Sequence, residues 1–200
     1  MIEILKYLLV AIAAYLLGSF STGILVASRQ GHDIRNEGSK NTGASNALRV
    51  LGVKGGAMVF IGDFIKASLA VLLGYLLCSK YGAMLGGLCV VLGHNWPIFF
   101  GFKGGKGIAC SAAIVLLTFW WQGLIAIVLC LAVIYFTRYI SLGSLTMLFV
   151  FFVLVTITPG VWPYGAWAFV LLALGVWRHR ANIERLKNGC ENKIGQKAKA

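Results

Sequence analysis

Three polar segments, rich in glycine and basic residues, interrupt an otherwise apolar chain of 200 residues. They cover residues 38–49, 93–107 and 178–189. Glycine lets backbone N–H groups approach a ligand closely, and lysine and arginine add fixed positive charge. Because hydrocarbon excludes such segments, we expect them at its surface. The combination indicates a binding site for phosphorylated, anionic molecules at a membrane interface.

The first segment combines small polar side chains with glycines at a spacing that allows tight turns. Backbone N–H groups that converge in such turns form an anion-binding nest, and Arg49 can donate two parallel hydrogen bonds to a phosphate. A polar loop that only caps the next helix is the alternative, although a cap needs a single serine or asparagine. The candidate ligands here are Ser39, Asn41, Gly43, Asn46 and Arg49.

The second segment contains Lys103-Gly-Gly-Lys-Gly107, which is similar to a phosphate-binding loop that opens a helix. It is not a nucleotide-binding Walker A loop, because Phe100 and Gly107 stand where that motif needs glycine and serine or threonine. Lys103 and Lys106 are therefore candidate phosphate ligands, with a membrane-surface anchor as the alternative, chiefly for Lys103. We interpret His94 as a residue that ends a helix.

The third segment places His179 between two arginines, just after the last apolar run. Neighbouring positive charge disfavours the imidazolium form and leaves a neutral ring that can accept a proton. Asn182 follows one helical turn later. A basic collar at the membrane surface explains the arginines but neither of these two residues. Ser144, at another turn expected on the same side, is a further candidate for contact with the ligand.

Asp63 and Lys66 lie inside an apolar run at i,i+3 spacing, which favours a structural ion pair over a catalytic one. The Asp, Glu, His and Cys residues show no metal-ligand spacing, so we expect no metal and no cofactor. The five cysteines are interpreted as small apolar residues.

Composition predicts an all-α integral membrane protein, because 59% of the residues are hydrophobic and only 12% are charged. About seven transmembrane helices are expected in a single domain over residues 1–200, with a short cytoplasmic tail from about residue 178 that is solvated after Glu191. The three middle runs are short, so five complete spans is the alternative. The apolar runs cover residues 4–28, 53–77, 83–100, 108–121, 124–137, 142–158 and 161–177.

The basic residues predict the orientation of these helices. With the N-terminus outside, fifteen of the 18 Lys and Arg residues fall on the inner side, and only Lys6 and Lys80 fall outside. This arrangement explains most of the net charge of +12 without a nucleic-acid partner. It also predicts a cytoplasmic C-terminus and places all three polar segments on the cytoplasmic side.

In these residues the chain closely resembles the bacterial acyl-phosphate:glycerol-3-phosphate acyltransferases, the PlsY family. The family signatures are a Gly-Ser-x-Asn-x-Gly-Ala-Thr/Ser-Asn-x-x-Arg loop, a Gly-His-x-x-Pro and Phe-Lys-Gly-Gly-Lys-Gly pair, and an Arg-His-x-x-Asn-Ile-x-Arg-Leu-x-x-Gly-x-Glu tail. All three occur here in order, and the likeness covers essentially the whole chain. Two mild departures are Lys40, often Gly in the family, and Ser45, often Thr.

The resemblance implies transfer of a fatty acyl group from acyl phosphate to the 1-hydroxyl of sn-glycerol 3-phosphate. The products are lysophosphatidate and inorganic phosphate, in phospholipid biosynthesis, without a metal or a coenzyme A thioester. The expected partners are the two substrates and membrane lipid, and the expected setting is a monomer in the bacterial cytoplasmic (inner) membrane. The catalytic assignment is His179, Ser39 and Arg49. The substrate-binding assignment is Lys106, Asn182, Ser144, Lys103, Asn41, Asn46 and Gly43.

Two questions stay open at the level of sequence. The proton acceptor is either His179 or a substrate phosphate, whose second pKa of about 6 suits the task. The rival function is a membrane carrier for an organic phosphate or other anion, although carriers usually place binding groups near the midplane and contain inverted repeats, which are not evident here. A non-catalytic lipid-binding subunit is a weaker alternative.

Overall fold

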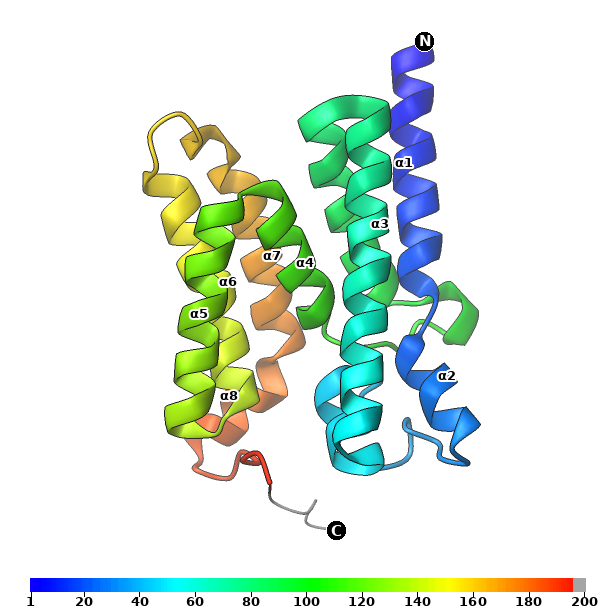
Figure 1. Ribbon diagram of the computed structural model, residues 1–200, viewed down its shortest axis with the longest axis vertical. Helices are drawn as coiled ribbons and strands as arrows, with labels where there is room; N and C mark the ends of the chain where they lie inside the picture. The colour runs from blue at the N-terminus through cyan, green and yellow to red at the C-terminus, as the bar shows by residue number, and fades with distance from the viewer. Residues whose placement is uncertain (196–200) are drawn as a thin grey trace. The chain divides into compact units, whose positions relative to one another are not determined.

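The computed structural model describes residues 1–195, which contain α-helices and short 3-10 helices but no β-strand. The all-α prediction is therefore confirmed. The helices are α1 (Ile2–Ser19), α2 (Thr22–Arg29), α3 (Ala44–Asn95), η1 (Ile98–Phe100), α4 (Ile108–Thr118), α5 (Trp120–Thr137), α6 (Ile140–Ile157), η2 (Trp162–Tyr164), α7 (Gly165–Arg178) and α8 (Arg180–Lys187) (Figure 1).

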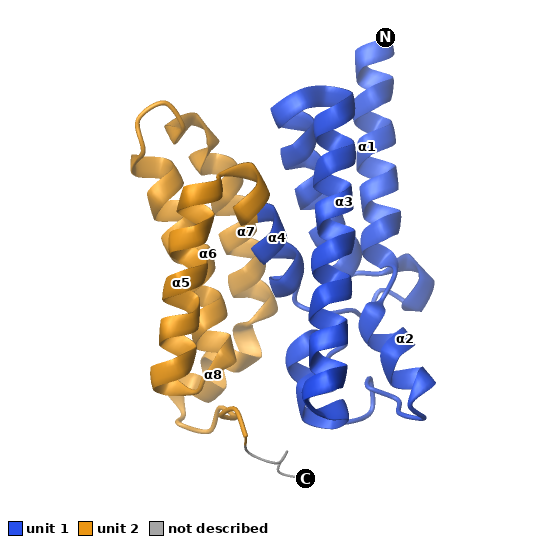
Figure 2. Ribbon diagram, in the orientation of Figure 1, with its two compact units in different colours: residues 1–114, 197–200 blue, residues 115–196 orange. Residues whose placement is uncertain are grey.

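The described chain divides into two compact units, where the sequence suggested one domain (Figure 2). Unit 1 consists of residues 1–114 and contains α1 to α3 with most of α4. Unit 2 begins at Val115 and contains α5 to α8. In unit 1, α1 and α2 pack against α3, and in unit 2 α6 packs against both α5 and α7.

Four stretches of the described chain are long and apolar enough to cross about 30 Å of hydrocarbon. They cover residues 2–29, 44–100, 120–137 and 140–157, while α4 and α7 are shorter. Large apolar side chains point outward, for example Leu76 at 71% and Phe136 at 81% exposure. An apolar surface of this kind is what lipid covers. The number of complete crossings stays a prediction.

α3 is a helical hairpin rather than one straight helix. Its backbone leaves the helical region at Gly52 and again at Cys78 and Ser79, and Figure 1 shows the two long arms side by side. A Cβ on Gly74 would lie 2.0 Å from the Gly82 carbonyl oxygen, and one on Gly82 would lie 2.1 Å from the Gly74 carbonyl oxygen. Such close approach through small residues is typical of membrane helices. The arms correspond to the apolar runs predicted at residues 53–77 and 83–100.

The first apolar run forms two helices, so the single helix predicted over residues 4–28 is wrong in its middle. α1 ends at Ser19 and α2 begins at Thr22. Ser21 caps α2, because its Oγ accepts a hydrogen bond from the Ile24 N–H at 3.4 Å. The break leaves carbonyl groups of α1 without intrahelical partners, and hydrocarbon cannot supply donors for them.

Lys66 on α3 supplies the missing donors. Its Nζ donates to the carbonyl oxygens of Gly18 at 3.1 Å and Phe20 at 2.8 Å. The same atom lies 2.8 Å from Asp63 Oδ1, which also accepts a hydrogen bond from the Thr22 hydroxyl at 3.1 Å. Only 5% of Lys66 and 1% of Asp63 are exposed. The predicted ion pair is confirmed, and it fastens α3 to the break between α1 and α2.

Unit 2 is built around a cluster of aromatic rings. Phe119, which separates α4 from α5, has its ring centroid 6.0 Å from that of Phe151, 5.4 Å from that of Tyr164 and 6.1 Å from that of Trp167. Because this ring is buried, the chain turns at one residue and α5 already begins at Trp120. The apolar runs predicted at residues 108–121 and 124–137 are therefore divided at the wrong place, and residues 120–123 form the first turn of α5.

The buried ion pair generates a stability prediction. Lys66→Met leaves the Asp63 carboxylate buried without its cation and should lower the free energy of unfolding by about 3–5 kcal/mol. The double variant Asp63→Asn, Lys66→Met removes both charges and should lose less. Thermal unfolding of the purified proteins in one detergent makes the comparison. An equal loss in the single and double variants would contradict a role for charge pairing.

Candidate active site

The loop between α2 and α3 is organised by Asn46. Its Nδ2 donates to the carbonyl oxygens of Ile34 at 3.1 Å and Glu37 at 3.0 Å, and its Oδ1 accepts from the Ser39 N–H at 2.8 Å. A Cβ on Gly38, which has φ +59°, would lie 2.4 Å from that Oδ1. Only 1% of Asn46 is exposed. This predicted substrate ligand therefore directs its amide to the loop backbone.

The end of the same loop prepares the first turn of α3. Gly43 is the N-cap, and its N–H donates to Asn41 Oδ1 at 3.0 Å. Lys40 has φ 57°, in the left-handed region that glycine adopts most readily, which explains why glycine suits this position. Ser39 is exposed on the loop and Arg49 is half-buried in α3. The predicted ligands of the first segment thus gather near one helix N-terminus, a favourable place for an anion.

The glycine-rich segment before α4 is a sequence of sharp turns. The φ angle is positive at Gly101, Phe102 and Gly107. α4 then begins at residue 108, as predicted. Lys103 is exposed, and Lys106 is half-buried close to the start of the helix. Fixed charge and a helix N-terminus therefore occur together, a combination that favours phosphate binding.

His94 has a larger part in this site than the predicted helix end. It is 6% exposed, and its Nδ1 lies 3.1 Å from Lys66 Nζ and 3.5 Å from Asp63 Oδ1. Its carbonyl oxygen accepts a hydrogen bond from the Gly105 N–H at 3.0 Å. Sequence reasoning missed this contact because His94 and Lys66 are 28 residues apart and no periodicity links them.

Asp63, His94 and Cys110 carry metal-ligand atoms within 4.8 Å of one another, a grouping that sequence spacing did not reveal. Cys110 Sγ also lies 3.4 Å from the Asp63 carbonyl oxygen. The Lys66 ammonium lies beside two of these groups, so a divalent ion would have to displace a buried cation. The residues fit this internal ammonium better than a metal.

Two buried polar side chains in unit 1 lie outside the predicted set of ligands. Asn95 is fully buried, and neither its Oδ1 nor its Nδ2 has a hydrogen-bond partner among the described residues. A Cβ on Gly107 would lie 3.1 Å from this Oδ1. Thr42 Oγ1 is buried and unpaired in the same way. Unpaired buried polar groups are uncommon, and both occur within the polar segments.

In unit 2, His179 forms the junction between α7 and α8, so its predicted place after the last apolar helix is confirmed. It is 3% exposed, and its Nδ1 lies 2.8 Å from the Gly175 carbonyl oxygen. A carbonyl only accepts hydrogen bonds, so Nδ1 carries the proton in the neutral ring and Nε2 is the acceptor. That tautomer suits a proton acceptor.

Glu191 holds this part of unit 2 together. Its Oε1 accepts from Ser141 Oγ at 2.8 Å and from Asn182 Nδ2 at 2.7 Å, and its Oε2 accepts from Arg185 Nε at 2.7 Å. Burial raises the pKa of this carboxyl, but the hydrogen bonds from Asn182, Arg185 and Ser141 outweigh it, so the pKa lies below the ordinary 4.5. The carboxylate thereby fixes Asn182.

Ser144 and His179 lie at the same level of unit 2. A Cβ on Gly175 would lie 2.1 Å from Leu148 Cδ1, and α6 and α7 run antiparallel (Figure 1). One helical turn from this contact toward α8 leads from Leu148 to Ser144 on α6 and from Gly175 to His179 on α7. The next turn leads to Ser141 on α6 and Asn182 on α8, which Glu191 bridges. Ser144 is 2% exposed, and its Oγ donates to the carbonyl one turn back at 2.8 Å. Unit 2 thus gathers Ser144, His179 and Asn182.

The chain after Glu191 contacts unit 2, although Lys193 and Gly195 stay exposed, so the solvated end predicted there is only partly right for residues 192–195. The Ile194 N–H donates to the Arg138 carbonyl oxygen at 2.8 Å, and Lys193 Nζ lies 5.4 Å from the centroid of the Tyr139 ring. The buried Glu191 carboxylate brings this segment to the turn between α5 and α6. The rest of the predicted tail, residues 196–200, lies outside the described residues.

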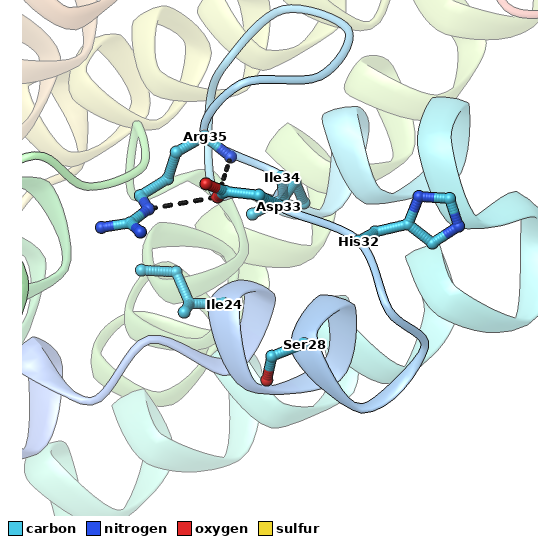
Figure 3. A pocket seen from close by; sticks show the side chains of 6 residues that line it. All are labelled: Ile24, Ser28, His32, Asp33, Ile34 and Arg35. Carbon is cyan, nitrogen blue, oxygen red and sulfur yellow. Dashed lines mark hydrogen bonds and ion pairs between the residues drawn. The ribbon is translucent and has the colours of Figure 1, made fainter.

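A small pocket beside α2 holds none of the predicted site residues (Figure 3). Arg35 Nε lies 3.3 Å from Asp33 Oδ1, and His32 points away from this pair in the view. Ion pairs as exposed as this one contribute little energy. The lining residues are Ile24, Ser28, His32, Asp33, Ile34 and Arg35.

Comparison with known proteins identifies the family. A family model described as glycerol-3-phosphate acyltransferase matches residues 8–189. The chain belongs to the glycerol-3-phosphate acyltransferase family. The resemblance stated from the sequence is confirmed, because the match covers all three polar segments.

Relatives in this family align with nearly the full chain. The glycerol-3-phosphate acyltransferase of Thermoanaerobacter pseudethanolicus is 45% identical over 94% of this chain and 96% of its own length. That of Clostridioides difficile is 42% identical over 98% of both chains. A crystal structure of PlsY, an integral membrane glycerol 3-phosphate acyltransferase in its glycerol 3-phosphate form, has a TM-score of 0.89 and 38% identity over 94% of this chain and 96% of its own. These likenesses and the apolar helices identify a membrane protein.

The depressed pKa of Glu191 predicts a pH effect on stability. A carboxyl whose pKa is lower in the folded state stabilises the protein above its ordinary value of 4.5, and that contribution is lost as the pH falls through the folded-state pKa. The wild type should therefore unfold at a higher temperature than Glu191→Gln near pH 7, and the difference should shrink below about pH 4.5. Thermal unfolding from pH 7 to pH 3.5 measures it. A difference that stays constant over this range would show that the charge is unimportant.

Proposed function

We propose that the protein transfers a fatty acyl group from acyl phosphate to the 1-hydroxyl of sn-glycerol 3-phosphate, giving lysophosphatidate and inorganic phosphate. Family membership is the observation that carries this proposal. The likeness to PlsY in its glycerol 3-phosphate form and in its lysophosphatidic acid form supports the acceptor and the product. Acyl phosphate as the donor rests on the resemblance of the three polar segments to the PlsY signatures.

In this reaction the bonds form and break between the two substrates, and the protein forms no covalent bond. The 1-hydroxyl oxygen attacks the carbonyl carbon of the mixed anhydride, and a base takes its proton. The bond from the carbonyl carbon to the bridging oxygen then breaks, and phosphate leaves with the electron pair. Because phosphate is already a good leaving group, the main task is to hold two mutually repelling phosphates in line. Positioning and fixed positive charge supply most of this catalysis.

Unit 1 supplies the positive charge in this proposal. Arg49 and Lys106 bind phosphate oxygens, supported by their half-buried positions near the N-termini of α3 and α4. Ser39 contributes a hydroxyl to the catalytic set, and Lys103 raises the local positive potential from its exposed position. The remaining ligands of the first segment act as a backbone nest shaped by Asn41, Gly43 and Asn46, with Asn46 acting through the loop that it holds.

Unit 2 supplies the hydroxyl-handling groups. His179 Nε2 accepts the proton of the attacking hydroxyl or holds that hydroxyl in line, which the tautomer set by the Gly175 carbonyl favours. Asn182 and Ser144 orient the acceptor beside it. A phosphate of the substrate is the alternative base, with a second pKa of about 6. No metal is needed at any step.

We also propose that the polar segments and the C-terminus face the cytoplasm and that the N-terminus lies outside, in the bacterial cytoplasmic membrane as a monomer. The distribution of basic residues along the chain supports the orientation, and the membrane and the monomeric state follow the family resemblance. Single cysteines beside Gly43, Gly105 and Gly189, introduced into a cysteine-free background, should resist an impermeant thiol reagent in whole cells. Labelling of any of them in intact cells would contradict this orientation.

The direct test is a product assay with purified protein. Acyl phosphate and glycerol 3-phosphate together should yield lysophosphatidate and phosphate, and a strong chelator should not reduce the rate. Acyl-coenzyme A should not replace acyl phosphate. Activity that needs the thioester, or activity lost in chelator and restored by a divalent ion, would overturn the proposed donor or the metal-free mechanism. An anion carrier would form no product.

The cationic ligands generate a mutational prediction. Arg49→Ala and Lys106→Ala should each cut turnover by at least roughly tenfold, the effect of losing about 1.4 kcal/mol of transition-state contact. Arg180→Ala is the matched control, because this guanidinium is exposed and stacks 5.4 Å from the centroid of the Trp177 ring. Equal, mild effects in all three variants would indicate a diffuse electrostatic surface in place of a phosphate site.

The base generates a separate prediction. His179→Asn keeps a hydrogen-bonding group but cannot take up a proton at neutral pH. If His179 is the base, the variant should lose about 10²–10⁴-fold in turnover, and the acidic limb of the wild-type rate profile should disappear. Substantial residual turnover with an unchanged acidic limb near pH 6 would assign the proton transfer to the substrate phosphate. The measurement is initial rate against pH for both proteins at saturating substrate.

A further inference from the structure

We propose that His94 is a positioning residue that couples the buried Asp63–Lys66 ion pair to the glycine-rich loop at residues 103–107. The proposal rests on the proposed function only in taking glycerol 3-phosphate as a ligand of that loop. His94 touches the ion pair through its ring and touches the loop through both its ring and its carbonyl group.

The first half of the coupling is the environment of the Lys66 ammonium. Four acceptors surround its three hydrogens, namely the carbonyl oxygens of Gly18 and Phe20, Asp63 Oδ1, and His94 Nδ1 at 3.1 Å. The same Nδ1 lies 3.5 Å from Asp63 Oδ1, so the His94 ring contacts both members of the ion pair. The ring orientation is thereby set by a cation that cannot move without losing its other partners.

The second half is the contact between the ring and Gly105. A Cβ on Gly105 would lie 2.0 Å from His94 Nε2 and 2.8 Å from its Cε1. A Cβ on Gly104 would lie 2.1 Å from the His94 carbonyl oxygen, to which the Gly105 N–H is bonded. The loop backbone is therefore seated directly on His94, with no room for a side chain at either glycine.

The consequence concerns Lys106, the next residue along the loop. Because Lys106 directly follows Gly105 in the chain, a displacement of the His94 ring also displaces Lys106, to which we assign phosphate binding. A misplacement of about 1 Å in a positioned group can reduce a rate by about 10²-fold. A histidine that served only to end α3 would need neither the buried cation at Nδ1 nor a glycine packed on Nε2.

The test is a double-mutant cycle on His94 and Gly105. In His94→Asn, the side-chain oxygen can replace Nδ1 as the acceptor for Lys66. The asparagine lacks the ring atoms that contact Gly105. Gly105→Ala instead adds a methyl group against the intact ring. The variants are His94→Asn, Gly105→Ala and the double variant, with His32→Asn as the matched control at an exposed histidine. Affinity for glycerol 3-phosphate is measured by calorimetry on the purified full-length proteins.

We expect Gly105→Ala to weaken binding at least roughly tenfold, because a close-packed ring must move. The double variant should bind at least about threefold more tightly than Gly105→Ala alone, since the shortened side chain makes room for the methyl group. In steady-state assays the KM for glycerol 3-phosphate should rise more than kcat falls. His32→Asn should match the wild type.

Additive losses in the cycle would overturn the proposal, as would an unchanged affinity in Gly105→Ala. Variants that lose thermal stability and kcat while keeping the wild-type KM would mark His94 as structural only. A wild type that binds glycerol 3-phosphate but forms no product from acyl phosphate would contradict the proposed donor and leave the binding cycle valid. A wild type that does not bind glycerol 3-phosphate would contradict the present proposal.

Discussion

The arrangement of unit 1 depends on one buried ammonium. Lys66 lies on an apolar helix, where an unpaired charge is costly, so its hydrogens must all find acceptors. The carbonyl groups at the α1–α2 break, the Asp63 carboxylate and the His94 ring provide them. The break in the first apolar run and the end of the α3 hairpin are therefore held around one cation. The glycine-rich loop is seated on the same cluster through Gly105.

Unit 2 uses a buried charge of the opposite sign for the same purpose. Glu191 accepts hydrogen bonds from Ser141, Asn182 and Arg185, and so joins α6, α8 and the chain beyond α8. This network fixes Asn182, one of the candidate site residues. In both units, charges that stabilise the fold are satisfied by protein groups, and the cations assigned to substrate are more accessible.

The sequence predicted the helical fold, the polar segments and the family well, because each leaves a local signal. Apolar runs predict helices, and glycines beside lysines predict the loop that opens α4. The errors concern contacts between distant residues. The α1–α2 break depends on Lys66, the single-residue turn at Phe119 depends on three rings from later helices, and the packed chain end depends on Glu191. His94 was interpreted too simply because its partners lie on other segments, and no periodicity in one sequence reports such contacts.

The central claim is that the protein transfers an acyl group by attack at the carbonyl carbon of acyl phosphate. Acyl phosphate carrying ¹⁸O in the bridging position between carbon and phosphorus tests it directly. Attack at the carbonyl carbon breaks the carbon–oxygen bond, so mass spectrometry should find the label in inorganic phosphate and none in the ester of lysophosphatidate. Label retained in free fatty acid, with phosphate transferred to the acceptor, would mean attack at phosphorus and would contradict the account.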